Sequence, residues 1–176
     1  TRDELPQSGA GKTIMTTEPK FVPGEAVEIT LAEKARAAVR MVDCVGYTVP
    51  GALGYEEANF PRMVRTPWFD EEVSFQEAAE IGTQKVIQEH STIGLVVTTD
   101  GSITEIKRED YVDAERRVIA ELRELGKPFI VVLNSTHPES DDTRGLGETL
   151  AAAYDVPVIP VDCLRMSTDD IMGVLG

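Results

Sequence analysis

Cysteine, long apolar runs and a targeting pattern are scarce or missing in this chain of 176 residues. Only two cysteines occur, Cys44 and Cys163, which argues against a disulfide framework and favours a reducing cytoplasm. Both lie in or beside apolar runs, so we expect small buried side chains. No apolar run approaches about 18 residues, the length of a membrane span, and the polar start of the chain lacks the pattern of a signal peptide. We therefore expect no insertion into a membrane.

Basic side chains are outnumbered by acidic ones. The chain has 17 Lys and Arg against 31 Asp and Glu, a formal net charge of −14. Such a charge disfavours binding to nucleic acid and adhesion to anionic lipid. The hydrophobic content of 41% is ordinary, and the length suits one globular domain, which we assign to residues 1–176.

Apolar runs that do not alternate with polar residues predict a buried parallel sheet. Such runs occupy 92–98, 129–133 and 156–161. Apolar residues with helical spacing occur before, between and after these runs, and predict helices at 74–90, 110–125, 143–154 and 167–174. Alternating strands and helices favour an α/β fold, with a mainly parallel sheet covered by helices on both faces.

The first third of the chain has a different pattern. Residues 18–31 and 37–42 have strand-like spacing, with a break expected at Pro23-Gly24 and a hairpin turn at 32–36. This hairpin would add an antiparallel edge to the sheet. Residues 47–72 have no period and are predicted to be a long, mobile, switch-like loop. A hairpin followed by strand–helix repeats is typical of switch-type nucleotide hydrolases, so the element order favours a fold of that kind.

The sequence Gly9-Ala10-Gly11-Lys12-Thr13 imitates a phosphate-binding P-loop but does not have its context. The motif needs glycine at position 6, where Pro6 stands, together with a preceding buried strand and a following helix. Neither is predicted here, so we interpret Lys12 as a solvated loop residue.

Asp43 and Gly46 form a D-x-x-G pattern at the end of a predicted strand. In nucleotide hydrolases this aspartate holds the Mg²⁺ shell, and the glycine N–H approaches the terminal phosphate. The pattern is weak by itself, because an aspartate followed by a turn glycine is common after any strand.

Two threonines, Thr16 and Thr17, precede the predicted hairpin. A hydroxyl here can bind Mg²⁺ while its peptide N–H reaches the γ-phosphate. They are otherwise ordinary loop threonines. The order of Thr17, hairpin, Asp43 and Gly46 matches a first switch, two strands and a second switch.

Asn134 and Ser135 follow the strand at 129–133, where a guanine-reading N-K-x-D motif is expected. Ser135 replaces the lysine, and His137 replaces the aspartate that accepts hydrogen bonds from guanine. Without that acceptor, selectivity for guanine should be lost. A polar turn after a strand remains an equal alternative.

Five long segments resemble one family. They are DELPQSGAGKTIMTTEPKFVP, RMVDCVGYTVPGALGYEE, PRMVRTPWF, FQEAAEIGTQKVIQEHSTIGLVVTTDGSI and GKPFIVVLNS. Together they resemble the N-terminal ATPase domain of the stage IV sporulation protein A family, the spore-coat morphogenetic ATPases of endospore-forming Firmicutes. By motif, Thr16 and Thr17 match the family's sensor threonines, and Asp43 matches its Walker B aspartate.

The resemblance implies a P-loop NTPase core related to the translation-factor GTPases, and an ATPase that uses ATP and Mg²⁺. It implies that hydrolysis drives self-polymerisation into the basement layer of the spore coat, on the mother-cell face of the outer forespore membrane. The implied partners are the protein itself, a small amphipathic protein that senses membrane curvature, and a further coat protein. Thr16, Thr17 and Asp43 would then be catalytic, Thr17 and Asp43 would bind the metal, and Gly46, Asn134 and Ser135 would bind the nucleotide.

The resemblance also implies that the family's P-loop, with its strand and first helix, lies upstream of residue 1. We therefore expect this chain alone to be inactive. Two alternatives stay open, namely a structural module that keeps the NTPase fold without catalysis, and a GTPase, which Ser135 and His137 disfavour.

Overall fold

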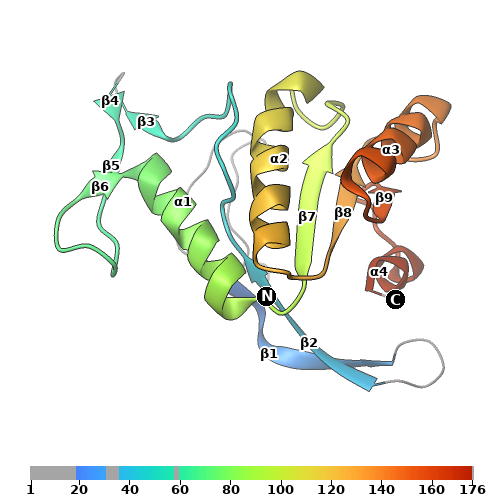
Figure 1. Ribbon diagram of the computed structural model, residues 1–176, viewed down its shortest axis with the longest axis horizontal. Coiled ribbons are helices and arrows are strands. Elements are labelled where there is room, and N and C mark those ends of the chain that lie inside the picture. The colour runs from blue at the N-terminus through green and yellow to red at the C-terminus, as the bar shows by residue number, and fades with distance from the viewer. Residues whose placement is uncertain (1–18, 31–35, 58–59, 176) are drawn as a thin grey trace. The chain divides into compact units, whose positions relative to one another are not determined.

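The computed structural model describes residues 19–30, 36–57 and 60–175 (Figure 1). The chain divides into two compact units, residues 1–27 with 40–91 and residues 28–39 with 92–176. Each unit is described by itself.

The second unit contains a three-stranded parallel sheet. Its strands are β7 (Gly94–Thr99), β8 (Phe129–Asn134) and β9 (Val158–Val161), in the order β7-β8-β9. Val131 at the centre pairs with Val96 on one side and Val158 on the other. All three predicted strands and their parallel arrangement are confirmed. Their carboxyl ends meet at one edge, where ligands of open α/β sheets bind.

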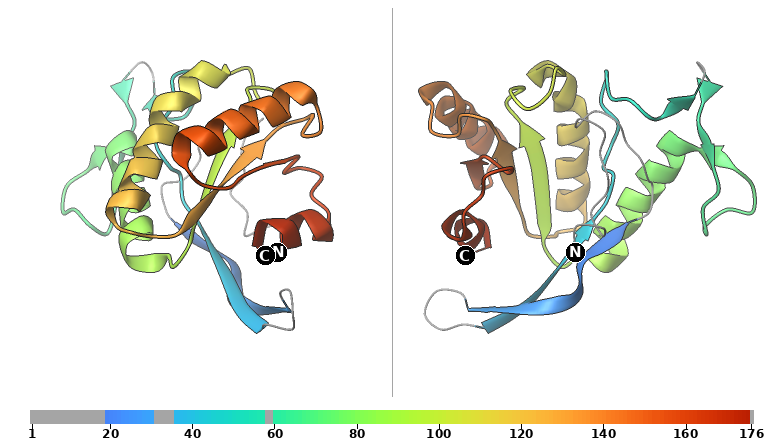
Figure 2. Two further views of the ribbon diagram at one scale, coloured as in Figure 1. Left: turned by 45° about the vertical axis from the view of Figure 1, so that its right-hand side comes forward. Right: turned by 180° about the vertical axis from the view of Figure 1, so that it is seen from behind.

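Two crossover helices, α2 (Arg108–Glu124) and α3 (Asp141–Tyr154), connect these strands. α2 packs against β7 and α3 against β9, and both lie on the same face of the sheet (Figure 1). Right-handed crossovers between strands added in one direction place both helices there. The opposite face of β7, seen from behind in Figure 2, exposes Leu95 and Val97. Helical cover of that second face stays a prediction.

Local sequence signals set the ends of these helices. Gly126 follows α2 with a φ of +63°, the left-handed conformation that ends helices. α3 begins at the N-cap Ser140, whose side chain accepts from the Thr143 N–H. Gly94 allows β7 to approach α2 and β8 closely, because a Cβ there would lie 3.0 Å from the Leu122 methyl carbons on α2 and 2.9 Å from the Phe129 Cβ on β8. The last helix, α4, spans Thr168–Leu175.

A buried carboxylate joins α2 to α3. The Glu115 side chain lies 2.8 Å from the Arg108 guanidinium and accepts from the Tyr154 hydroxyl at 2.5 Å. Burial, together with this carboxylate, raises the pKa of Tyr154. Because Glu115 is charge-paired and hydrogen-bonded, the buried charge is tolerated.

In the first part of the chain, β1 (Lys20–Thr30) and β2 (Arg36–Asp43) pair in a two-stranded sheet of their own. Within the described ranges, this hairpin therefore does not provide an edge to the parallel sheet, contrary to our prediction. The predicted break at Pro23-Gly24 is also wrong, since β1 continues through both residues. Residues 32–35 of the hairpin turn predicted at 32–36 lie outside the described residues, and Arg36 belongs to β2.

The first unit also holds α1 (Phe75–Lys85), which continues as a π-helical turn over Val86–His90. Ser74 is its N-cap, as predicted, and accepts from the Glu77 N–H at 3.2 Å. Phe75, Ala78 and Ala79 are buried, as the helical spacing predicts.

The segment 47–72, predicted to lack regular structure, contains short strands. β3 (Glu56–Glu57) pairs with β4 (Phe60–Pro61), and β5 (Met63–Val64) pairs with β6 (Val73–Ser74). Strands of two residues are too short to leave an alternating pattern in the sequence, which explains the error.

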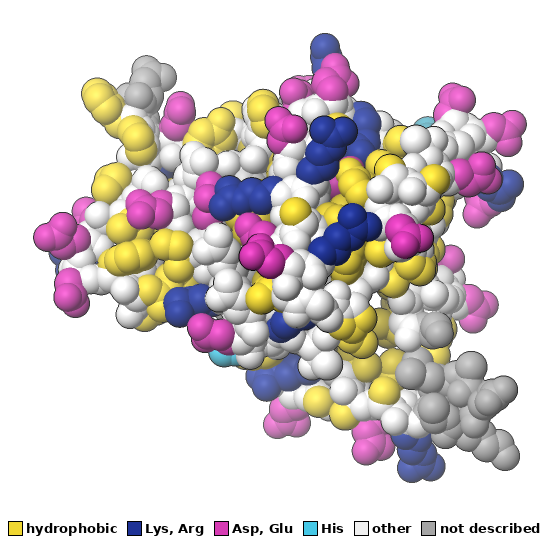
Figure 3. Space-filling view, viewed as in Figure 1, with side chains coloured by type: hydrophobic (Ala, Val, Ile, Leu, Met, Phe, Trp, Pro, Cys, Tyr) yellow, Lys and Arg dark blue, Asp and Glu magenta, His cyan; other side chains and the backbone are white. Residues whose placement is uncertain are grey.

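Both cysteines are free thiols, consistent with the absence of a disulfide framework. Cys44 is half-buried, but Cys163 is exposed in the turn after β9, so our expectation of burial is wrong for Cys163. On the face shown in Figure 3, Lys and Arg side chains lie among the more numerous Asp and Glu side chains. No helix in the described part of the chain is long and apolar enough to cross a bilayer.

Candidate functional site

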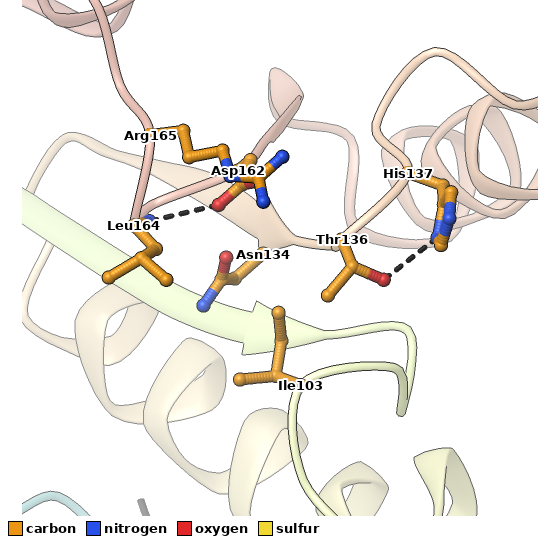
Figure 4. Close-up of a pocket in the computed structure, with 7 residues that line it drawn as sticks. All are labelled: Ile103, Asn134, Thr136, His137, Asp162, Leu164 and Arg165. Atoms are coloured by element: carbon orange, nitrogen blue, oxygen red, sulfur yellow. Dashed lines mark hydrogen bonds and ion pairs between the residues drawn. The ribbon is translucent and has the colours of Figure 1, made fainter.

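A cavity of about 350 Å³ lies at the carboxyl ends of the parallel strands (Figure 4). This volume lies within the range of roughly 300–1,000 Å³ for small-molecule sites. The loops after β7, β8 and β9 all contribute to its lining, which consists of Ile103, Asn134, Thr136, His137, Asp162, Leu164 and Arg165.

Asn134, the last residue of β8, is a predicted nucleotide-binding residue that does line this cavity. Its Oδ1 accepts a hydrogen bond from the Cys163 backbone N–H at 3.0 Å. The bond holds the amide against the turn after β9 and directs Nδ2 to the other side. Asn134 therefore offers a hydrogen-bond donor at the cavity.

Asp162 follows β9 directly and provides a carboxylate beside Asn134 (Figure 4). Its Oδ1 accepts from the Leu164 N–H at 3.0 Å, and its Oδ2 lies 3.9 Å from the Arg165 Nε. The Asp162 side chain is 18% exposed, whereas Arg165 is 82% exposed. The cavity thus combines an amide donor with a partly buried acceptor.

The loop after β8 is fixed by a network centred on Asp100, which follows β7. Asp100 Oδ2 accepts from the Ser135 hydroxyl at 2.6 Å and from the Thr143 hydroxyl at 3.2 Å, and its Oδ1 accepts from the Ser102 N–H at 2.9 Å. Burial alone would raise the pKa of Asp100, but the hydrogen bonds from Ser102, Ser135 and Thr143 outweigh it and hold the pKa below its usual value. The network ties the ends of two strands to the start of α3.

Ser135, predicted to bind nucleotide, lies inside this network. It is fully buried, and its Oγ also accepts from the His137 N–H at 2.9 Å. Its neighbours Thr136 and His137 line the cavity instead, and the Thr136 Oγ1 lies 2.8 Å from the His137 Nδ1. Ser135 is therefore placed to shape the loop, and its contact with a nucleotide stays a prediction.

Asp43, the predicted metal and catalytic residue, ends β2 in the first unit. The side chain is exposed, yet partial desolvation raises the pKa of its carboxyl, against the lowering effects of the Cys44 N–H and the nearby Lys20. Thr16 and Thr17 lie outside the described residues. No group of three or more His, Cys, Asp and Glu side chains suited to a metal occurs in the described ranges.

Gly46, predicted to approach a phosphate, has a φ of +79°, which favours glycine. Its N–H donates to the Thr83 Oγ1 at 3.0 Å, and its carbonyl lies 3.3 Å from the same hydroxyl. Thr83 is buried on α1. In this conformation the N–H assigned to a phosphate is occupied by the protein itself.

Comparison with known proteins identifies the family. Residues 1–176 match the sequence model of the family described as Stage IV sporulation protein A, ATPase domain. The chain belongs to this family.

Relatives named Stage IV sporulation protein A occur in three organisms. The chain is 58% identical to that of Bacillus anthracis and 57% identical to those of Bacillus subtilis (strain 168) and Clostridioides difficile (strain 630), over 99% of its own length in each case. It spans 35–36% of the length of these relatives. No solved structure matches the chain.

Asp162, Thr136, Ile103, Leu164 and Arg165 line the cavity but were not predicted. A signal existed for Asp162, because it follows a predicted parallel strand directly, as Asn134 does. A polar residue that directly follows any parallel strand is a candidate for the binding site, whether or not it lies in a known motif.

Proposed function

We propose that this domain binds and hydrolyses ATP in a Mg²⁺-dependent reaction. The observation that carries the proposal is the match of all 176 residues to a family described as an ATPase domain. The cavity at the carboxyl ends of β7, β8 and β9 supports it, because open α/β sheets bind their ligands there. The P-loop NTPase core expected from the sequence is part of this proposal.

Asn134 is proposed to contact the base at the cavity of the second unit. Asp43, Thr16, Thr17 and Gly46 are proposed, from the resemblance, to serve the phosphates and the metal. Asp43 fits Mg²⁺, since this ion keeps several waters and takes one or two carboxylates together with substrate phosphates. A single exposed carboxylate is therefore a suitable protein ligand. Bound Mg²⁺ would neutralise charge that develops on the phosphates.

We further propose that hydrolysis drives self-assembly of the coat basement layer at the forespore surface during sporulation. The support is the name of the relatives, Stage IV sporulation protein A, at 57–58% identity. Recruitment by a curvature-sensing amphipathic protein and contact with a further coat protein belong to the same proposal. So does a location at the mother-cell face of the outer forespore membrane.

A non-catalytic structural module is the second candidate. The observation that favours it is the engagement of the Gly46 N–H by Thr83, since a catalytic glycine must release this N–H to a phosphate. A GTPase is disfavoured because His137 stands where a guanine-reading carboxylate is expected.

The deciding experiment measures ATP hydrolysis by the full-length protein with and without Mg²⁺. We expect Asp43→Ala and the double variant Thr16→Ala/Thr17→Ala to lose activity by about tenfold or more, as removal of transition-state charge stabilisation does. Asp113→Ala, a change on the exposed surface of α2, serves as the control and should hydrolyse normally. Normal hydrolysis by the Asp43 variant would favour the structural module.

A further inference from the structure

Thr83 on α1 carries a buried hydroxyl that contacts the glycine turn after β2. Its Oγ1 lies 2.8 Å from the Ala79 carbonyl oxygen, 3.0 Å from the Gly46 nitrogen and 3.3 Å from the Gly46 carbonyl oxygen. The hydroxyl has one proton, and the shorter of the two carbonyl distances assigns that proton to Ala79. Toward Gly46, the Thr83 oxygen therefore acts as an acceptor.

A phosphate oxygen would compete with Thr83 for the same donor. Like the hydroxyl oxygen, a phosphate oxygen accepts hydrogen bonds, and Gly46 has one N–H to give. Gly46 has a φ of +79°, and no atom lies within 4 Å of the position that a Cβ would occupy, so that side of the turn is not crowded. The N–H can therefore bind Thr83 or a phosphate, but it makes one good hydrogen bond at a time.

We propose that Thr83 competes with the γ-phosphate of ATP for the Gly46 N–H, and thereby lowers the affinity of the protein for ATP relative to ADP. The proposal rests on the ATP-binding function proposed above, in which Gly46 serves the phosphates, and it adds a positioning residue that regulates this step. ADP has no γ-phosphate, so it binds without disturbing the Thr83 bond. ATP has to displace Thr83 before its γ-phosphate receives the N–H.

The size of the effect follows from the exchange of one hydrogen bond. The net contribution of one such bond changes an equilibrium constant by about fivefold. Because coupling between two binding events is reciprocal, a bound γ-phosphate weakens the hold of Gly46 on Thr83 by the same factor. The presence of the γ-phosphate is therefore passed to α1.

Both ends of α1 contact the segment that precedes it. At the first residue, the Phe75 N–H donates to the Arg62 carbonyl at 2.7 Å, and the Arg62 guanidinium lies 4.7 Å from the centre of the Phe75 ring. At the last residue, the Lys85 Nζ lies 6.0 Å from the centre of the Trp68 ring. A shift of α1 on release of Thr83 therefore changes the surroundings of Trp68, the only tryptophan of the chain.

The first test measures the affinities of the full-length protein for a non-hydrolysable ATP analogue and for ADP, both with Mg²⁺, by displacement of a fluorescent ADP analogue. Thr83→Val keeps the shape of the side chain and removes the acceptor, which leaves the Gly46 N–H to the γ-phosphate. We expect the affinity for the ATP analogue to rise about fivefold relative to that for ADP. An unchanged or lowered ratio would overturn the inference.

Two further variants separate this effect from a loss of local structure. Thr83→Ser retains the hydroxyl, so it should keep the wild-type ratio of the two affinities. Thr149→Val removes a hydroxyl that makes the same kind of bond to the carbonyl four residues earlier, but on the exposed surface of α3, and should also keep the ratio. If Thr83→Ser shifted the ratio as far as Thr83→Val does, the hydroxyl would not be the cause and the inference would fail.

The second test leaves Thr83 in place and uses Trp68 as a reporter. The difference in fluorescence between the full-length wild type and Trp68→Phe isolates the signal of this side chain. We expect the ATP analogue to change that signal and ADP to leave it at its nucleotide-free value. Equal Trp68 signals with the ATP analogue and with ADP would show that the γ-phosphate does not act on α1, and would contradict the inference.

The outcomes separate this inference from the proposed function. If the wild type hydrolyses ATP but Thr83→Val keeps the wild-type ratio of affinities, Thr83 does not compete with the γ-phosphate and the ATPase proposal stands. If the full-length wild type binds neither nucleotide, both proposals fail together.

Discussion

At the residue scale, Asp43 shows how a group proposed for function can oppose stability. Its exposed carboxyl has a raised pKa, so the ionised form is less favourable in the folded protein than in the unfolded chain. A bound metal ion would favour the ionised form of the Asp43 carboxyl and so offset its desolvation. The cause of the shift is desolvation of the carboxyl.

The stability effect of Asp43 has a definite sign. A raised folded pKa stabilises the protein below the unfolded pKa of about 3.9, and this contribution is lost as pH rises through the folded pKa. At neutral pH, Asp43→Asn should therefore leave the melting temperature of the full-length protein unchanged or slightly raised, while ATP hydrolysis falls by about tenfold or more. Calorimetry and a phosphate-release assay check this, and a lowered melting temperature would contradict the burial effect.

Thr83 is the residue that holds Gly46. Its one hydroxyl proton lies between the carbonyls of Ala79, at 2.8 Å, and Gly46, at 3.3 Å, while the oxygen accepts the Gly46 N–H. A phosphate that takes this N–H must therefore replace an existing hydrogen bond. This exchange connects the state of the glycine loop to the position of α1.

Thr83→Val tests this connection, because valine has the same shape without the hydroxyl. Leaving the Gly46 N–H without its partner should destabilise the local structure by about 1–3 kcal/mol, seen as faster amide hydrogen exchange at Gly46 and in α1. Thr149→Val is a matched control, because Thr149 makes the same kind of bond to the carbonyl four residues earlier but is exposed on α3. Unchanged exchange at Gly46 in the Thr83 variant would show that the bond contributes nothing.

At the scale of elements, prediction succeeded where signals were local. β7, β8, α2 and α3 follow from apolar runs and from the helical spacing of apolar residues. It failed for β1, where a Pro-Gly pair continues a strand, and for the short strands of 47–72. Whether such segments pair depends on their neighbours in space, which the sequence pattern does not contain.

The candidate site was predictable to a smaller extent. Asn134 could be found because it follows a strand in a motif-like context. The orientation of Ser135 depends on Asp100, which lies 35 positions earlier in the chain and also binds Thr143, 43 positions after it. Asp162 lines the cavity because the loops after β7, β8 and β9 lie close together in space. The spacing of residues in the sequence does not predict that proximity.

The Asp100 network gives the strand ends a pH dependence. Because the folded pKa of Asp100 is lowered, its contribution to stability is full above the unfolded pKa of about 3.9 and is lost as pH falls through the folded pKa. Protection of β8 and α3 amides from hydrogen exchange should therefore weaken in acid below about pH 4.

Asp100→Asn separates this effect from general acid destabilisation. The variant should lose about 1–3 kcal/mol of local stability at neutral pH, because charged hydrogen bonds become neutral ones. The difference between variant and wild type should shrink as pH falls below about 4. Asp113→Asn provides the matched control on the exposed surface of α2. A difference that stays constant with pH would mean that the Asp100 charge does not stabilise the strand ends.

At the scale of the whole molecule, the chain spans only 35–36% of the length of its relatives. Assembly therefore has to be tested in the full-length protein. The formal charge of −14 adds a physical constraint, because copies of this domain repel one another at low ionic strength. A polymer must overcome this repulsion through specific contacts, and the proposed role of hydrolysis is to make those contacts available.

Assembly should therefore depend on hydrolysis and not on salt alone. With ATP and Mg²⁺, we expect the full-length wild type to enter the pellet on sedimentation. Asp43→Ala, or the wild type with a non-hydrolysable ATP analogue or with Mg²⁺ chelated, should stay in the supernatant. Raising salt shortens the range of charge repulsion to a few ångströms near 1 M, so a salt series with the Asp43 variant isolates the electrostatic barrier. If salt alone restored the pellet, charge screening would suffice for assembly, and the coupling between hydrolysis and polymerisation would have to be abandoned.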